Sequence, residues 1–272
     1  MSNLMLGCEW PPIVDKRNIK LSAVLNMKQL FIPVEFDAEV DLMGSIFPGR
    51  MDGNDVDPCC VISMQAKVSR KLEYIEQGHL VNITDADVKA EWRRQSGGSG
   101  GLYMLNAYNE WRKTGWTITN GKLNAAKTKG CWSKFFPKPV PVSTAQHLDI
   151  HAFAALDDPD ELRASIYYLH NGECAVMLYQ KDIDQFNAGE PWHLTGDDGE
   201  KVGGHALDVP SFHADGSFDD WSWGKRQPMD EAWFMARKYD IFAAVDNRDN
   251  FKVNNPTDYE KFEALLNEIV SS

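Results

Sequence analysis

The stretch MDGNDVDPCCVISMQAKVSRKLEYIEQG, residues 51–78, decides the interpretation of this chain. From its eleventh residue onward the apolar positions recur at steps of three and four, which predicts an amphipathic helix over residues 59–77 that ends at a glycine. Asp57 is suited to the N-cap of that helix. Cys59 and Cys60 are therefore expected in the first turn of a long helix.

A cysteine in this position has the setting of a nucleophile. The N-terminus of a helix carries partial positive charge and lowers the pKa of a thiol, and a neighbouring imidazolium lowers it further. His205 is the best candidate for that imidazole, because it begins an apolar strand after two glycines, in GGHAL, 145 residues after Cys60. The other histidines lack this setting.

The chain divides into three parts by the secondary structure that its sequence predicts. Residues 1–50 look like an irregular arm with short strands, the best of them at residues 30–34. Residues 51–140 are helix-rich, with further helices expected at 84–95 and 102–113 on either side of a glycine and serine loop.

Residues 141–272 are expected to be rich in strands, after a proline-rich extended crossover at residues 135–142. Strands are predicted at residues 174–179, 205–209 and 239–245, and helices at residues 159–171, 229–238 and 258–270.

Four pieces resemble the papain-like cysteine peptidases by their order: Gly53-Asn54 before Cys60 and its helix, Ser99-Gly100-Gly101, Gly204-His205-Ala206 and Ser222-Trp223-Gly224. The thiol and the histidine are separated by roughly 130–150 residues in papain-type enzymes, which includes the distance found here. The resemblance implies an α+β, two-lobed fold, with a helical lobe, an antiparallel β lobe and the active site between them. A narrower likeness is to uncharacterised papain-like proteins of bacteriophages.

The resemblance also implies roles. Cys60 would be the nucleophile, and His205 would be its base and later the acid for the leaving amine. Asn54 stands where the family has its oxyanion-hole glutamine and would donate alongside the backbone N–H of Cys60. Gly100 and Gly101 would contact the backbone of an extended peptide. Cys59 is interpreted as a buried neighbour, because the spacing from Asn54 favours Cys60.

The third triad member departs from the family pattern. The family has an asparagine before Ser-Trp-Gly, and here that position is Trp221, which cannot accept a hydrogen bond from an imidazole. Asp220 is expected to take over, with Asp219 as an alternative. Trp223 would shield the partner of His205 from water.

Composition limits the classes of partner. The net charge of −12 over 272 residues argues against nucleic acid as the main partner. No window approaches the ~20 apolar residues of a membrane span, and the start has no signal-peptide pattern, so we expect a cytoplasmic protein, or one of the host cytoplasm or virion if a phage encodes it. Five cysteines without a CxxC pattern indicate neither a disulfide framework nor a zinc site, and we expect no cofactor or metal.

Two functions fit these observations. The first is a cysteine hydrolase that cleaves peptide or isopeptide bonds of a peptide or protein substrate through a thioester. The second is a catalytically inactive papain-like scaffold with a structural or binding role, for instance in a phage particle. The presence of Trp221 where the family has its triad asparagine favours this second function. The sequence leaves open the oligomeric state and whether residues 1–50 inhibit the site or strap the fold.

Overall fold

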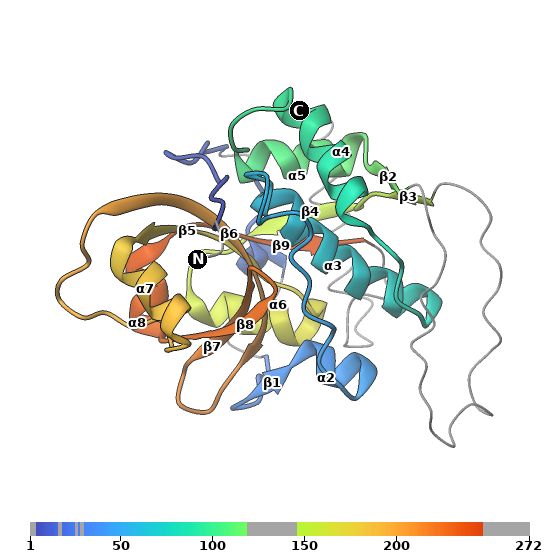
Figure 1. Cartoon of the computed structure of the whole chain (residues 1–272). Helices are drawn as coiled ribbons and strands as arrows, with labels where there is room; N and C mark the ends of the chain where they lie inside the picture. Colours follow the sequence, from blue (N-terminus) through green and yellow to red (C-terminus); the bar gives the residue numbers. More distant parts are fainter. Residues whose placement is uncertain (1–3, 16–17, 25–26, 28–29, 119–145, 247–272) are drawn as a thin grey trace, which may run out of the picture.

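The computed structural model describes residues 4–15, 18–24, 27, 30–118 and 146–246 (Figure 1). It has an α+β fold with a helical lobe and a sheet lobe, as the sequence predicts. The helical lobe holds the long helix α3 and two shorter ones: α3 (Cys60–Gln77), α4 (Asp85–Ser96) and α5 (Met104–Lys113).

The sheet lobe is built on one antiparallel sheet with the strand order β4-β9-β5-β6-β7-β8, and β1 adds to the far end of β6. Its strands are β1 (Phe36–Asp37), β4 (Ala152–Ala155), β5 (Glu173–Tyr179), β6 (Lys201–Phe212), β7 (Phe218–Ser222), β8 (Lys225–Met229) and β9 (Lys238–Val245). A separate two-stranded sheet joins β2 (Trp116–Ile118) to β3 (Gln146–Leu148).

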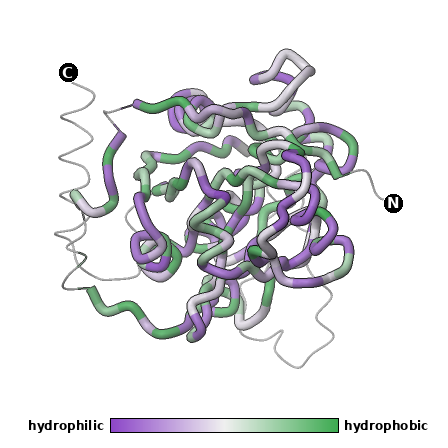
Figure 2. The backbone as a smooth tube through the Cα atoms, turned by 90° about the vertical axis from the view of Figure 1, so that its left-hand side faces the viewer, coloured by the Kyte–Doolittle hydropathy of each residue, from purple (hydrophilic) through white to green (hydrophobic). Residues whose placement is uncertain are grey.

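The central sheet separates two hydrophobic cores, because successive strand residues point to opposite faces. On β5, Cys174 and Val176 belong to the core on one face, and Ala175 to the core on the other. The first core, here the sheet core, is covered by α6 (Pro159–Leu169), α7 (Gln180–Ala188) and α8 (Glu231–Arg237). The second, here the helix core, contains residues of α3, α4 and α5. Figure 2 shows hydrophobic and hydrophilic positions interspersed along the chain.

Helix α3 packs against β6 and brings the cysteine pair to the centre of the molecule. Its start differs from the prediction: the helix begins at Cys60, Cys59 is the N-cap, and Asp57 instead forms an ion pair with Lys89 at 2.5 Å. Its end is as predicted, because Gly78 adopts the left-handed conformation (φ 70°) and its N–H bonds to the Tyr74 carbonyl.

Of the other predicted elements, one is wrong and two lie outside the described residues. The predicted strand at residues 30–34 is wrong: no strand forms there, and β1 follows instead. Among its described residues the arm also forms the helices α1 (Leu21–Val24) and α2 (Ala38–Met43). The predicted crossover at 135–142 and the helix at 258–270 lie outside the described residues, and the boundaries at 50 and 140 stay predictions.

Candidate active site

Cys60 is the first residue of α3 and is 1% exposed. Burial raises the pKa of its thiol to about 11, although backbone N–H groups of Ala206, Gly7 and Val61 point at the sulfur and oppose this rise. The thiol therefore lies at a helix N-terminus and directly beside the residue that follows His205.

His205 lies on β6 opposite Val176 and is equally buried. Its ring stacks on the indole of Trp223, with the ring centroids 4.1 Å apart and the planes 11° from parallel. Burial, and next the positive charge of Lys67, lower the pKa of His205 to about 3. The ring is therefore neutral at pH 7.

Neither ring nitrogen of His205 has a hydrogen-bond partner among the described residues. The structure thus brings Cys60 and His205 onto packed neighbouring elements, α3 and β6, but no hydrogen bond joins them here. With these pKa values the pair is a neutral thiol and a neutral imidazole rather than an ion pair.

The predicted orienting residue, Asp220, does not bind His205 in this structure. It is fully buried on β7, and its Oδ2 accepts a hydrogen bond from the Ser222 hydroxyl at 2.6 Å, while its Oδ1 has no partner within the described part of the chain. Burial raises its pKa well above the usual range. Trp221 is turned to the arm, where its Nε1 donates to the Glu39 carboxylate at 2.7 Å.

Asn54 lies in the turn before α3 and is 3% exposed. Its backbone N–H bonds to the Met51 carbonyl at 3.1 Å, and its side-chain Oδ1 is buried with no hydrogen-bond partner in the residues that the structure describes. The turn is fixed at Asp52, whose carbonyl accepts from the Ser63 hydroxyl at 3.0 Å and from the Cys59 thiol at 3.6 Å.

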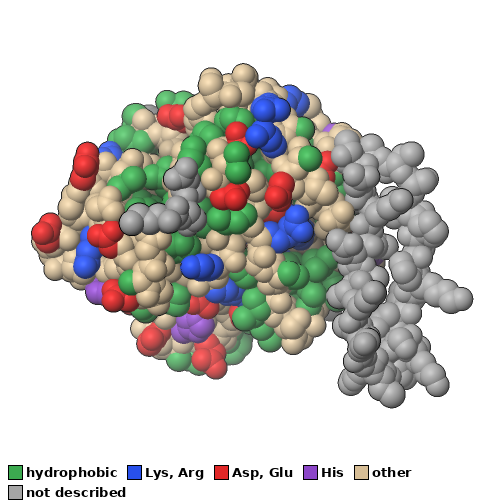
Figure 3. Space-filling model, viewed as in Figure 1, with side chains coloured by type: hydrophobic (Ala, Val, Ile, Leu, Met, Phe, Trp, Pro, Cys, Tyr) green, Lys and Arg blue, Asp and Glu red, His purple; other side chains and the backbone are tan. Residues whose placement is uncertain are grey.

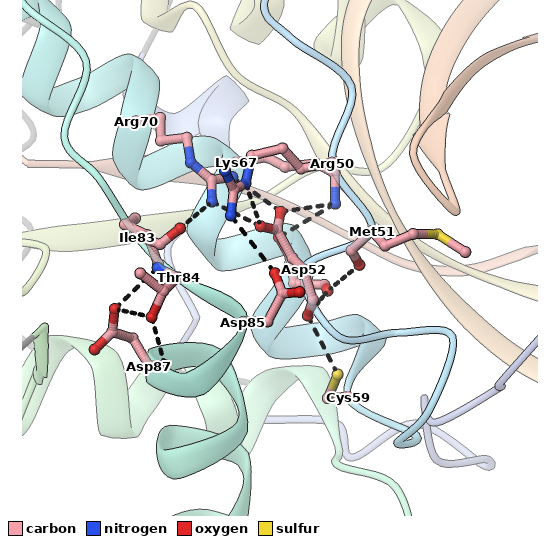
Figure 4. A network of polar contacts seen from close by, with 11 residues as sticks. Arg50, Met51, Asp52, Cys59, Lys67, Arg70, Ile83, Thr84, Asp85 and Asp87 are labelled. Atoms are coloured by element: carbon pink, nitrogen blue, oxygen red, sulfur yellow. Dashed lines mark hydrogen bonds and ion pairs between the residues drawn. The ribbon is translucent and has the colours of Figure 1, made fainter. Parts of the chain in front are cut away.

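The carboxylate of Asp52 is held by three cations (Figure 4). Arg70 contacts both of its oxygens, at 2.9 and 2.7 Å, while Arg50 and Lys67 approach to 3.2 and 3.5 Å. Burial alone would raise the pKa of Asp52, but the charges of Arg70 and Lys67 outweigh it and hold this pKa below its usual range. A buried ion-pair network thus holds the turn that carries Asn54.

The glycine loop is occupied by the arm of the same chain. Trp92 holds the loop through a hydrogen bond from its Nε1 to the Gly100 carbonyl. The Gly101 N–H donates to the Glu9 carboxylate at 2.9 Å, and Leu102 exchanges backbone hydrogen bonds with Gly7 and Glu9. The arm therefore lies where the resemblance predicts the backbone of a bound peptide.

The arm passes between the two lobes, as the dark blue segment of Figure 1 shows. Cys8 forms a parallel bridge to Leu102 of the helical lobe and an antiparallel bridge to Gly204 of β6. A Cβ on Gly7 would lie 1.9 Å from the Pro58 carbonyl oxygen, and one on Gly204 would lie 2.1 Å from that of Cys8. Glycine is needed at both positions for this approach.

Two features of the site were missed by the sequence analysis. The Asp52 network had a weak signal, because Lys67 and Arg70 stand three apart on one face of the predicted helix. The contact of Glu9 with Gly101 had none, since it joins residues 92 apart and depends on the path of the arm.

Known structures share this architecture. Xylellain, a cysteine protease from Xylella fastidiosa, superposes with a TM-score of 0.63 and 15% identity, over 91% of this chain and 98% of that one. The chain has the papain-like fold. Procathepsin B from Trypanosoma congolense matches with a TM-score of 0.57 and 13% identity, over 90% and 87% of the two chains. A cysteine protease from Carica candamarcensis matches with a TM-score of 0.51 and 15% identity, over 80% and 100%.

No family model matches the sequence, and no curated protein is similar enough in sequence to match it. The papain-like chain has no helix within its described residues that is long and apolar enough to cross a membrane.

Proposed function

We propose that this papain-like chain is a cysteine hydrolase that cleaves peptide or isopeptide bonds, with Cys60 as nucleophile and His205 as base. The observation that carries the proposal is the position of the Cys60 thiol. It stands at the N-terminus of a long helix and against the backbone of the residue after His205, among N–H groups that stabilise a thiolate.

The reaction would run through a thioester. The Cys60 sulfur attacks the substrate carbonyl carbon, and its proton passes to His205. The oxyanion is held by the Asn54 amide and the backbone N–H of Cys60. His205 then gives the proton to the leaving amine, and water hydrolyses the thioester. Trp223, stacked on the imidazole, keeps the ring in a fixed plane during both proton transfers.

The arm determines when this chemistry can begin. With residues 7–9 between the lobes, Cys60 and His205 are both 1% exposed, and burial holds both in their uncharged forms. Displacement of the arm by a substrate would hydrate both groups and move both pKa values toward the range in which a thiolate–imidazolium pair forms.

Alkylation tests the proposal. The intact chain and a Gly7→Ala variant, in which the new methyl group would clash with the Pro58 carbonyl, are treated with iodoacetamide or an epoxide near neutral pH and mapped by peptide. Cys60 of the variant should react far faster than a free thiol. Adding His205→Ala to this variant should reduce the alkylation rate of Cys60 to that of a free thiol. If Cys60 reacts no faster than Cys8 in either protein, the hydrolase proposal fails.

A second function is favoured by the environment of His205. Its two ring nitrogens lack partners among the described residues, and the position expected to orient it holds Trp221, which is bonded to Glu39. These contacts suit a catalytically inactive papain-like scaffold with a structural or binding role, for instance in a phage particle in the host cytoplasm or virion. An inert Cys60 in the arm-displaced variant would support this alternative.

A further inference from the structure

A polar groove begins at Gly101 and runs along α5, with a cavity volume of about 780 Å³. Its walls come from the end of α4, the segment after the glycine loop, and α5, while the arm closes it through Asp15, Asn18 and Ile19. The groove therefore continues from the contact where a peptide backbone is expected.

The walls formed by α4 and α5 carry an excess of positive charge. They hold Arg94, Arg112 and Lys113, against a single carboxylate, Glu110, in a chain whose net charge is −12. Arg94 is paired with Glu91 of α4 at 2.7 Å and with Glu110 at 3.1 Å. The Arg112 guanidinium instead lies 5.9 Å from the centre of the Phe153 ring and has no carboxylate partner among the described residues. Basic side chains lie over these helices at the top of Figure 3.

The arm brings carboxylates to this groove. Glu9 accepts the hydrogen bond of the Gly101 N–H, and Asp15 lines the groove. Up to Glu9 the arm pairs with the helical lobe as an added strand would: Leu102 donates to the Gly7 carbonyl at 2.9 Å and accepts from the Glu9 N–H at 3.0 Å. The arm thus places one carboxylate on Gly101 and one in the lining of the groove.

We propose that this groove binds the acidic residues of a peptide substrate, whose backbone takes the place of the arm on Gly101 and Leu102. The substrate class is then a peptide with Asp or Glu beside the bond to be cleaved, and Arg112 and Lys113 determine that specificity. This inference rests on the proposed hydrolase function, but it is tested by binding, which does not require turnover.

The test compares two fluorescent peptides of equal length, one with Glu and Asp residues and one with Gln and Asn at those positions, by anisotropy on the full chain. The acidic peptide should bind about tenfold more tightly, as expected for two or three exposed charge pairs. Arg112→Met with Lys113→Met should remove the preference. Arg93→Met with Lys181→Met changes the net charge equally outside the groove and should retain it.

The arm provides a second measurement. Glu9→Gln removes the carboxylate from Gly101 and should tighten binding of the acidic peptide, since the two compete for one N–H. Equal binding of both peptides, a preference that survives the groove variant, or no binding even to Gly7→Ala would overturn the inference. An acidic preference together with a Cys60 that stays unreactive in Gly7→Ala would overturn the hydrolase and leave the groove assignment standing.

Discussion

At the scale of single residues, the turn before the nucleophile depends on one buried carboxylate. Asp52→Asn would leave Arg70 buried without its anionic partner and would loosen the turn that carries Asn54. Breaking a buried ion pair by removing one partner costs roughly 3–5 kcal/mol. We therefore expect a loss of about 3 kcal/mol in the free energy of unfolding, measured by urea denaturation.

Asp55→Asn supplies the matched control, because it makes the same chemical change at an exposed position of the same turn. Its effect should stay within about 0.5 kcal/mol. Equal losses from the two substitutions would contradict a special role for the Asp52 carboxylate.

The positions of some single residues could be predicted from the sequence, and the contacts of others could not. The position of Cys60 at the start of a helix follows from local pattern, whereas a place for Trp223 near His205 was implied only by the resemblance to papain-like peptidases. The bond of Asp220 to Ser222 could not be predicted, because it depends on strand geometry: both residues lie on β7, two apart, on one face.

At the scale of elements, the arm is held in place by close backbone contacts that tolerate only glycine. Gly7→Ala should push the arm away from Pro58 and hydrate the Cys60 thiol, so the pKa of this thiol should fall from its raised value. Each unit of that fall increases the thiolate fraction about tenfold. We expect iodoacetamide to alkylate Cys60 of the variant at least about ten times faster than in the parent chain.

Gly44→Ala is the control for general damage to the arm. Gly44 has a left-handed backbone (φ 69°), so alanine strains the arm there, but its methyl group would meet nothing within 4 Å. Its Cys60 should react at the parental rate. A Gly7→Ala protein with the parental rate would show that the arm does not limit access to the thiol.

Elements with strong local signals were predicted well, and those specified by tertiary contacts were not. The start of α4 was expected at Thr84, and the structure has a capping box there between Thr84 and Asp87. Strand β8 was missed, since its sequence KRQPM is polar and contains a proline, and it forms by pairing with β7 along its whole length. The path of the arm was likewise outside the reach of local pattern.

At the scale of the whole molecule, buried charges join the two lobes. Lys71 of α3 contacts Asp208 of β6 at 2.5 Å, and Asp208 stands opposite Glu173 of β5. Glu173 in turn accepts from the Tyr108 hydroxyl of α5 at 2.6 Å. One ammonium group thus faces two buried carboxyl groups, so the second of them is expected to keep its proton.

The stability of the molecule should therefore depend on pH through Glu173. Burial, together with the charge of Asp208, raises the pKa of Glu173 from 4.5 to about 8, although Tyr108 and Lys71 act in the opposite direction. Between these two values the folded chain keeps a proton that the unfolded chain has lost, so the contribution of Glu173 is complete below pH 4.5 and is lost as the pH rises through 8. The slope for one proton is about 1.4 kcal/mol per pH unit.

Glu173→Gln isolates this contribution, because glutamine is uncharged at every pH and can still accept from Tyr108. Urea denaturation from pH 5 to 8.5 should show the parent losing stability relative to the variant as the pH rises, with the difference levelling off above pH 8. Glu35→Gln, at an exposed position, should run parallel to the parent. If the difference in the free energy of unfolding between the parent and Glu173→Gln stays constant over this range, Glu173 is already ionised in the folded chain. The lobes are then joined by two ionised carboxylates that face Lys71, rather than by one carboxylate and one protonated carboxyl group.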